Sequence, residues 1–294
     1  FALTNSDDTV NGTFSTLTIN DRIIDNTTTD KDVLNVELLG GASVPTTVEI
    51  KNVETLNFNV LSGTATVDAT NYSGYNTVAN TGTGTLALTN LKSTSAEYVM
   101  KGATGGLNLG FAPAAVAGID TAKVTLDGTT SGALTVDANV ENVVLTTKNS
   151  AATLTNFVAT GATTVAIKGG QGFKLDAANS FATATTIDAR EAGKAEFAAT
   201  AATTLLTGST DDKITLGKAF AANDLINLGA GNDTLVFNVA STVTNAATLI
   251  GVENVTFKTT GSAIDMKNAD QKAALTFEGG TTISAIDLAL GSTV

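Results

Sequence analysis

The chain has 294 residues, of which 28 are acidic and 16 are basic, and its formal net charge is −12. It contains no Cys and no His, which excludes disulfides, zinc–cysteine sites and histidine acid–base catalysis. Arg22 and Arg190 are its only arginines, so binding to a nucleic-acid backbone is not expected. The common metals left for such a chain are those that prefer oxygen ligands, calcium first.

Hydrophobic residues make up 43% of the chain, which is enough to build a core. Small β-branched side chains with abundant Thr favour strands in a narrow core. Because no run of about 18 apolar residues occurs, we expect no membrane-spanning helix. The chain begins at Phe1 without a Met or a signal peptide, which predicts a piece of a larger or processed protein.

Acidic residues gather near the start of the chain. The turn-like sequence NSDDTVNG (5–12) is followed by further aspartates and then by the strand-like sequence VLNV (33–36). These carboxylates could fill much of a calcium shell of roughly six to eight oxygens. The predicted ligands are Asp7, Asp8, Asp21, Asp25, Asp30 and Asp32. A solvated acidic face without a metal is the alternative.

Pairs of apolar residues separated by one residue recur at intervals of about ten residues, with the alternation of strands. A β-sandwich and a parallel β-solenoid both have this spacing. Residue types recur as well: VETLNF (53–58), VENVVL (140–145) and VENVTF (252–257) are near copies. We therefore predict an all-β, right-handed parallel β-solenoid (β-helix) with turns of about twenty residues.

Composition divides this predicted solenoid into three regions. They are an acidic, calcium-binding start at residues 1–60, a Thr/Ala/Gly-rich solenoid at residues 61–204, and calcium repeats with C-terminal turns at residues 205–294. Two Ala-containing segments, 195–202 and 268–274, could form a turn or two of helix. The segment 110–118, which contains Pro113, could interrupt the stack.

Two kinds of carboxylate recur next to the predicted strands. Asp-Ala pairs begin at Asp68, Asp137, Asp176 and Asp188, and we interpret them as Asx-turns in which the side chain accepts a hydrogen bond from a turn amide. Val-Glu pairs that end at Glu54, Glu141 and Glu253 are also expected to cap turns. A stacked row of carboxylates would need cations or staggering.

The stretch 205–237 contains two copies of a turn followed by a short apolar strand. GAGNDTL (229–235) follows part of the calcium-binding nonapeptide repeat, and TGSTDDKI (207–214) is the same turn with fewer glycines. Glycines permit the left-handed turn, while aspartate supplies carboxylate oxygens. The predicted calcium residues are Thr210, Asp212, Asp224, Gly229, Gly231, Asn232 and Asp233.

An enzyme that acts on acidic polysaccharides is a further alternative, since many solenoids use clustered carboxylates with a basic residue. Arg190, between Asp188 and Glu191, is the only such group in the repeat region. Trp is absent and only three Tyr occur, so no aromatic platform for sugars is evident. We therefore predict that the protein is not an enzyme.

The order of segments resembles that of RTX-type bacterial surface-layer (S-layer) proteins of the Caulobacter and Campylobacter kind. The resemblance lies in FALTNSDDTVNGT, LTINDRIID, DKDVLNVEL and IKNVETLNF near the start, in residues 205–237, and in IGVENV (250–255). By motif, Asp8, Asp21 and Asp32 match the acidic N-terminal positions, and Asp212, Asp233, Gly229 and Gly231 match the repeat positions. Thr207, Ser209 and Thr210 stand where further glycines are expected. Asp25-Asn26 stands where paired glycines are usual, and residues 27–31 look inserted.

The resemblance implies a structural, calcium-dependent β-solenoid that is exported by type I secretion and self-assembles into a two-dimensional lattice on the cell surface. The implied partners are further copies of the chain and outer-membrane lipopolysaccharide, the latter through a region missing from this sequence. A calcium-stabilised secreted adhesin passenger is the alternative binding function.

Overall fold

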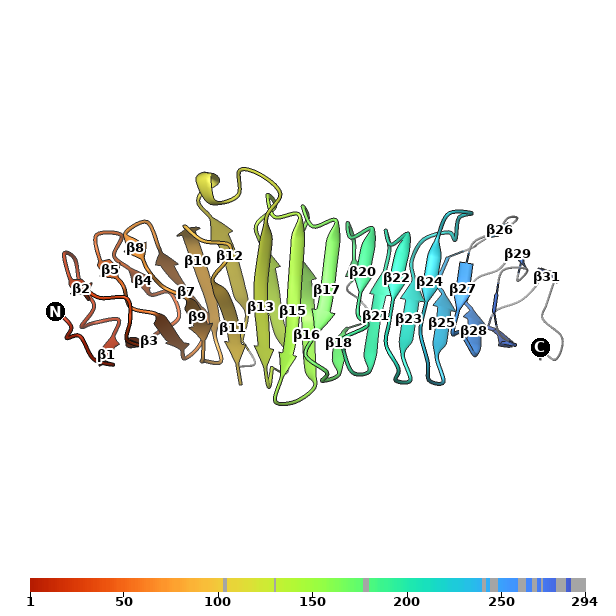
Figure 1. The fold of residues 1–294 in the computed structure, drawn as a ribbon, viewed down its shortest axis with the longest axis horizontal. Helices are drawn as coiled ribbons and strands as arrows, with labels where there is room; N and C mark the ends of the chain where they lie inside the picture. Colours follow the sequence, from red (N-terminus) through yellow and green to blue (C-terminus); the bar gives the residue numbers. More distant parts are fainter. Residues whose placement is uncertain are drawn as a thin grey trace. The chain divides into compact units, whose positions relative to one another are not determined.

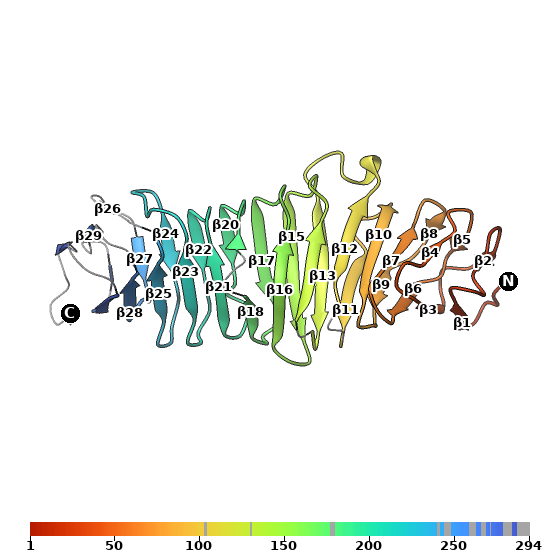
Figure 2. The ribbon, with the colours of Figure 1, turned by 180° about the vertical axis from the view of Figure 1, so that it is seen from behind.

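The computed structural model describes residues 1–102, 105–129, 131–176, 180–239, 242–243, 248–258, 263–265, 269–270, 272–278 and 284–286. These residues form parallel strands and one short 3₁₀ helix, η1 (Pro113–Ala115). The chain divides into two compact units, Phe1–Gly161 and Ala162–Val294. Figures 1 and 2 show the strands of each unit from opposite sides. The three regions drawn from composition remain a prediction.

The first unit is a parallel β-solenoid with three strand rows. Its first sheet contains, in order, β1 (Thr9–Thr13), β3 (Val33–Leu38), β6 (Thr55–Val60), β9 (Thr77–Asn80), β11 (Glu97–Lys101), β13 (Thr121–Asp127) and β15 (Asn142–Lys148). Its second sheet contains β4 (Ser43–Val44), β7 (Thr64–Asp68), β10 (Thr85–Leu91), β12 (Leu107–Phe111), β14 (Gly132–Val136) and β16 (Ala152–Val158). The third row contains β2 (Arg22–Ile24), β5 (Glu49–Lys51) and β8 (Tyr72–Ser73).

The second unit repeats this organisation. Its first sheet contains β17 (Thr164–Lys168), β20 (Thr186–Asp188), β22 (Thr204–Leu206), β24 (Leu225–Asn227) and β27 (Thr248–Ile250). Its second sheet contains β18 (Phe173–Leu175), β21 (Ala195–Ala199), β23 (Lys213–Leu216), β25 (Thr234–Phe237), β28 (Asn254–Phe257) and β30 (Ala274–Phe277), with β19 (Ser180–Phe181) beside β21. The third row contains β26 (Thr242–Val243), β29 (Ala263–Asp265) and β31 (Ser284–Ile286).

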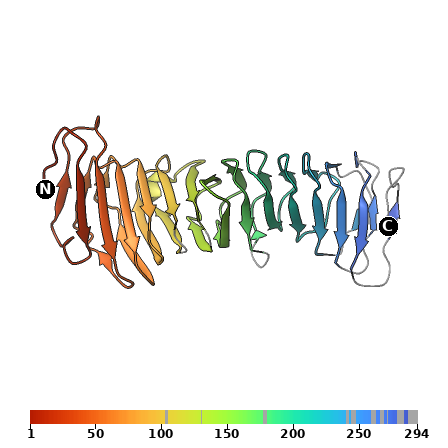
Figure 3. The same cartoon turned by 90° about the horizontal axis from the view of Figure 1, so that it is seen from below.

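The strands within each sheet lie side by side (Figure 3), and their parallel register places like residues on like residues. In the first unit Leu34 pairs with Leu56, and Leu56 with Val78, so that register partners lie 22 residues apart. Many strands follow the predicted alternation, as in β6, where every second residue is buried. Others, such as β9 and β11, bury three residues in succession. The predicted parallel β-solenoid is confirmed, and its turns are slightly longer than the predicted twenty residues.

Aromatic rings extend this stacking through the core of the second unit. The Phe237 and Phe257 rings stack with centroids 5.1 Å apart, and the Phe257 and Phe277 rings with centroids 5.3 Å apart. Such offset pairs add roughly 0.5–1.5 kcal/mol each beyond the burial of apolar area. The repeated aromatic position therefore helps to fix the register of successive turns.

Two expectations about departures from the strand pattern are wrong. Ala195–Ala199 is strand β21, not helix, because it pairs with β18 on one side and β23 on the other, which overrides the helix propensity of Ala. The segment around Pro113 does not interrupt the stack. It forms an excursion between β12 and β13 (Figure 1), while β11 still pairs with β13 and β12 with β14. In the segment 268–274, the described residues form no helix either: Ala269 bridges to Leu249 and Ala274 begins β30, while residues 268 and 271 lie outside the described residues.

Candidate functional site

Carboxylates form a row along successive turns of the first unit, each directly before a strand. The Asp8 N–H donates to Asp32 Oδ1 at 2.8 Å, and the Asp32 N–H donates to Glu54 Oε2 at 2.9 Å. These residues precede β1, β3 and β6. We call Asp8, Asp32 and Glu54 the first carboxylate row.

The second unit contains an equivalent row. The Asp212 N–H donates to Asp233 Oδ1 at 2.7 Å, and the Asp233 N–H donates to Glu253 Oε2 at 2.8 Å. The Ala195 N–H in turn donates to Asp212 Oδ1 at 2.7 Å. We call Asp212, Asp233 and Glu253 the second carboxylate row.

The prediction that the Val-Glu pairs cap turns is confirmed. Glu54 and Glu253 each accept an N–H from the turn before, and Glu141 Oε2 accepts the Asp120 N–H at 2.9 Å. Each of these bonds satisfies a backbone donor that no strand partner takes. The bonds also place carboxylates of successive turns close together, which is unfavourable while all of them are ionised.

Three carboxylates of the first unit converge at the loop between β2 and β3. Asp25, Asp30 and Asp32 each offer a ligand atom within 4.8 Å of those of the other two, and we call them the three-Asp cluster. Asp25 and Asp32 are fully buried. Among the described residues, one oxygen of each carboxylate has no hydrogen-bond partner: Asp25 Oδ1, Asp30 Oδ2 and Asp32 Oδ2. The cluster therefore combines three neighbouring carboxylates with three unpartnered oxygens.

The pKa values within the cluster respond to these surroundings. Burial raises the pKa of Asp32, and the carboxylates of Asp30, Asp25 and Glu54 raise it further. The pKa of Asp25 is lowered, chiefly by the hydrogen bond from the Thr27 hydroxyl.

The other predicted N-terminal ligands are engaged elsewhere. Asp21 Oδ2 accepts the N–H and hydroxyl of Thr18, and Asp8 Oδ2 accepts the N–H and hydroxyl of Thr4. Asp7 Oδ1 accepts the Lys31 N–H at 2.9 Å. These three aspartates close turns, and the structure does not bring them into the three-Asp cluster.

The second carboxylate row also contains unsatisfied oxygens. Asp212 and Asp233 are almost completely buried, and Oδ2 of each has no hydrogen-bond partner. Burial raises the pKa of Asp233 to about 6, and the carboxylates of Asp212, Glu253 and Asp211 act in the same direction. An additional positive charge beside Asp233 would favour its ionised form and offset the cost of its burial.

Glycines bring the turn backbones of the second row into close contact. Gly229 and Gly231 have positive φ angles of 86° and 140°. A Cβ at Gly229 would lie 1.8 Å from the Gly208 carbonyl oxygen, and one at Gly231 would lie 2.7 Å from the Thr210 carbonyl oxygen. Both the positive φ angles and the lack of room for a Cβ therefore explain why these two positions require glycine, as predicted.

The remaining predicted residues of the second unit have identified partners. The Thr210 hydroxyl donates to Asp212 Oδ1, and the Asn232 N–H donates to Asp211 Oδ1. Lys218 Nζ lies 2.9 Å and 2.8 Å from the two carboxylate oxygens of Asp224, which also accepts the Ala221 N–H. Asp224 thus already has a cationic partner, whereas the buried oxygens of Asp212 and Asp233 do not.

The Asp-Ala pairs form the predicted Asx-turns wherever the structure describes them in full. Asp68, Asp137 and Asp188 each accept the N–H of the residue two positions later. Their pKa values are all lowered, Asp188 mainly by the Arg190 side chain and the other two by turn hydrogen bonds that outweigh burial. Residues 177–179, which follow Asp176, lie outside the described residues.

The arginine–carboxylate group of the enzyme alternative belongs to one of these turns. Arg190 Nε lies 2.9 Å from Asp188 Oδ1, and its terminal nitrogen lies 2.7 Å from Oδ2. Both side chains are at the surface. This pair stabilises its own turn, which accounts for the two residues without a substrate.

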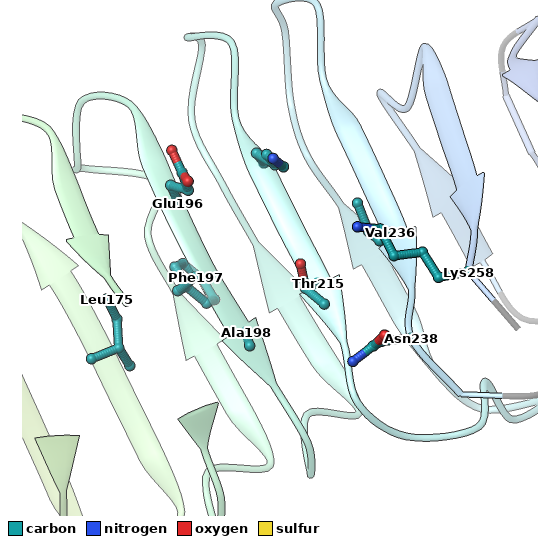
Figure 4. A pocket seen from close by; sticks show the side chains of 9 residues that line it. Leu175, Glu196, Phe197, Ala198, Thr215, Val236, Asn238 and Lys258 are labelled. Atoms are coloured by element: carbon teal, nitrogen blue, oxygen red, sulfur yellow. The ribbon is translucent and has the colours of Figure 1, made fainter. Parts of the chain in front are cut away.

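A shallow groove lies on the second sheet of the second unit (Figure 4). It has a volume of about 190 Å³. Ala198, Thr215 and Val236 are register partners and form one row of its lining. Lys213, Lys258 and Glu196 add charges of both signs. The groove is therefore polar and mixed in charge rather than a concentrated acid–base site.

The donor set of the acidic sites fits calcium. Among the described residues, every unpartnered buried side-chain oxygen except the Tyr72 hydroxyl belongs to a carboxylate, the hard ligand that calcium prefers. Asp25, Asp30 and Asp32 would hold an ion in the first unit, and Asp212 and Asp233 would contribute to one in the second.

Several residues that shape these sites were missed from the sequence. Thr27 bonds to both Asp25 and Asp30, and Lys218 neutralises Asp224. An outward-facing asparagine ladder, in which Asn57 Nδ2 donates to Asn35 Oδ1 and Asn35 Nδ2 to Asn11 Oδ1, was also missed. Its signal was available as Asn at the same place in each of three adjacent strands of the sheet.

Comparisons with known proteins give no match, so the geometry of the acidic sites is the basis for assigning a function. No protein-family model, curated protein or solved structure matches this chain. Within the described residues, no helix combines the length and the apolar character that crossing a membrane requires. The buried acidic sites are therefore the most informative functional feature of the molecule.

Proposed function

We propose that this chain is a structural, calcium-stabilised β-solenoid of the bacterial cell surface that self-assembles into a two-dimensional lattice. One observation carries the proposal: buried carboxylates of both units keep oxygens without partners. A protein with such carboxylates gains stability from an oxygen-binding cation, and calcium is abundant outside cells. The protein would thus be least stable where calcium is scarce and most stable at the cell surface.

Neutralisation of the acidic charge links calcium to assembly. The net charge of −12 makes copies of the chain repel one another. Bound calcium lowers this repulsion and can be shared between carboxylates of adjacent copies. The Thr-rich outer faces would then supply lattice contacts. Export by type I secretion and attachment to lipopolysaccharide, through a region outside this sequence, belong to the same proposal.

The test is a calcium titration of chelator-stripped protein, followed by light scattering, with electron microscopy of the end point. Growth into ordered sheets in calcium, and not in magnesium at the same ionic strength, is the expected result. A monomer that becomes more stable in calcium but never assembles would overturn the lattice and support a calcium-stabilised adhesin. Identical stability in calcium and in chelator would overturn the calcium dependence itself.

A further inference from the structure

We propose that Asp25, Asp30 and Asp32 bind one divalent cation at a self-contained site, and that this cation fastens residues 1–32 to the rest of the first unit. The identity of the ion rests on the calcium dependence proposed above. The site itself adds a local function, because it holds one end of a unit in place rather than stabilising the whole solenoid.

The first step is the supply of ligand atoms. Each of the three carboxylates leaves one oxygen without a hydrogen-bond partner, and ligand atoms of the three lie within 4.8 Å of one another. Oxygens that bind one calcium ion at about 2.3–2.6 Å lie at most about 5 Å apart. The geometry therefore suits one ion held by three carboxylates, with water or carbonyl oxygens in the remaining positions.

The second step is a shortage of hydrogen-bond donors. Thr27 supplies its N–H to Asp25 Oδ2 at 2.6 Å, and its hydroxyl lies 2.6 Å from Asp25 Oδ2 and 2.7 Å from Asp30 Oδ1. A hydroxyl has one proton, so it can donate to only one of these carboxylates at a time. The Asp8 N–H bonds to Asp32 Oδ1. Among the hydrogen bonds of the described residues, one hydroxyl is thus shared between Asp25 and Asp30, and one oxygen of each of the three carboxylates receives no donor.

The third step concerns charge. The ion pairs formed by the described residues use none of the three carboxylates. Three adjacent negative charges, two of them on fully buried residues, are strongly unfavourable without a positive partner. A cation supplies that charge and occupies the side of each carboxylate that lacks a donor.

The fourth step is what the ion would connect. Asp25 directly follows β2, Asp30 lies in the loop, and Asp32 directly precedes β3, so one ion closes the loop of residues 25–32. Asp32 also holds the Asp8 N–H, and Asp8 holds the N–H and hydroxyl of Thr4. The ion is therefore linked through two short hydrogen-bonded steps to the start of the chain.

The expected consequence is local opening when the ion is removed. The segment before the cluster forms the end of its sheets: among the described strands, β1 pairs only with β3, at five register positions, and β2 only with β5, at three. Terminal strands that are paired on one side open with a lower free energy than strands paired on both sides. Removal of calcium should therefore expose residues 1–32 before it unfolds the rest of the first unit.

The test is hydrogen exchange followed by mass spectrometry on the full chain, in calcium and in chelator, together with calorimetric counting of bound calcium. Asp30→Asn removes one ligand charge from a loop residue that is only partly buried, and its amide oxygen can still accept the Thr27 hydroxyl. Asp21→Asn is the matched control, because Asp21 lies in the same segment but outside the cluster.

In the wild type and in Asp21→Asn, calcium should slow exchange in peptides covering residues 4–8 and 26–32 at least tenfold. In Asp30→Asn that protection should be lost, and one calcium ion fewer should bind. Unchanged protection and calcium count in Asp30→Asn would overturn the proposal. So would a wild type whose residues 4–32 exchange equally fast in calcium and in chelator, a comparison that needs no variant.

The same samples separate this site from the proposed lattice. Sheets that form in calcium without calcium-dependent protection of residues 4–32 would overturn the local site and leave the lattice standing. Protection that appears in a chain that never assembles would support the local site and overturn the lattice.

Discussion

The two carboxylate rows use the same backbone hydrogen bond but obtain their surroundings in different ways. In the first row, Asp32 gains two further carboxylates from the loop that precedes it, Asp25 and Asp30. In the second row, Asp233 follows a turn in which glycines let successive backbones touch, with Gly229 packed against the Gly208 carbonyl. The first environment is built from side chains and the second from close-packed backbone.

This difference explains why one sequence pattern describes only one of the rows. The glycine turn is recognisable because glycine is required wherever a Cβ would overlap a carbonyl. A side-chain cluster needs only acidic residues that the fold brings together, and its members can be separated by residues of any type. The comparison also predicts that the two rows respond differently to substitution.

The largest effect is expected from adding a side chain where the turn backbones beside the second carboxylate row are in contact. Gly229→Ala should destabilise the second unit by roughly 3–5 kcal/mol, because it combines a positive φ with an overlap with the Gly208 carbonyl. Gly170→Ala is the control, since Gly170 also has a positive φ but no atom within 4 Å of its Cβ position. It should cost only about 1–2 kcal/mol. Equal losses in urea denaturation would contradict the close-contact explanation.

The second-largest effect is expected from Asp233→Asn, which should lower the stability in calcium but not in chelator. Asp233→Asn keeps the acceptor for the Asp212 N–H but removes a buried charge. In calcium at about 100 times its dissociation constant the variant should lose about 3 kcal/mol, the stabilisation that such binding supplies. In chelator at pH 7 it should be at least as stable as the wild type. Thermal unfolding in both conditions checks this, and a loss of the same size in chelator would show that Asp233 has a purely structural role.

A pH titration sharpens the same point without a substitution. Burial raises the pKa of Asp233 from 3.8 to about 6 in the folded protein, which therefore binds this proton more tightly than the unfolded chain does. The stability from this group is fully present below about pH 4 and is lost as the pH rises through 6, by about 3 kcal/mol in chelator. Asp32 acts in the same direction. A wild type whose stability between pH 4 and 7 in chelator does not fall relative to that of Asp233→Asn would contradict this assignment.

The smallest effect is expected at an aspartate outside both rows. Asp137 accepts the Phe111 N–H at 2.9 Å and the Asn139 N–H at 3.0 Å, and these bonds lower its pKa despite partial burial. Asp137→Ala should cost about 1 kcal/mol, equally in calcium and in chelator. A cost that appears only in calcium would extend the cation chemistry to the Asx-turns.

Much of the fold could be predicted because a solenoid repeats its local rules. The near copies around Glu54, Glu141 and Glu253 indicated both the stacking and the capping role of these glutamates. Ala195–Ala199 was predicted incorrectly because pairing with two neighbouring strands, which a local pattern does not contain, overrode its helix propensity.

The sequence was sufficient to predict that the candidate sites are made of aspartates, but not which aspartates lie together. Six N-terminal aspartates were equivalent in the sequence, whereas the fold brings only Asp25, Asp30 and Asp32 together. Asp224 looked like a ligand because its partner Lys218, six residues away, carries no signal of its own. Which carboxylates can bind the same cation depends on the distances between them, and these distances follow from the length of each turn.

The 22-residue spacing of register partners such as Leu34, Leu56 and Val78 has a consequence for how such a chain can evolve. Each turn contacts only the turns before and after it, so a duplicated or deleted copy of one full turn restores the same neighbours. An insertion of one residue within a strand would instead turn its buried side chains outward. Genetic changes in steps of a whole turn are therefore the changes that this architecture tolerates best, and the number of turns in a unit can vary between descendants while the register within each turn is kept.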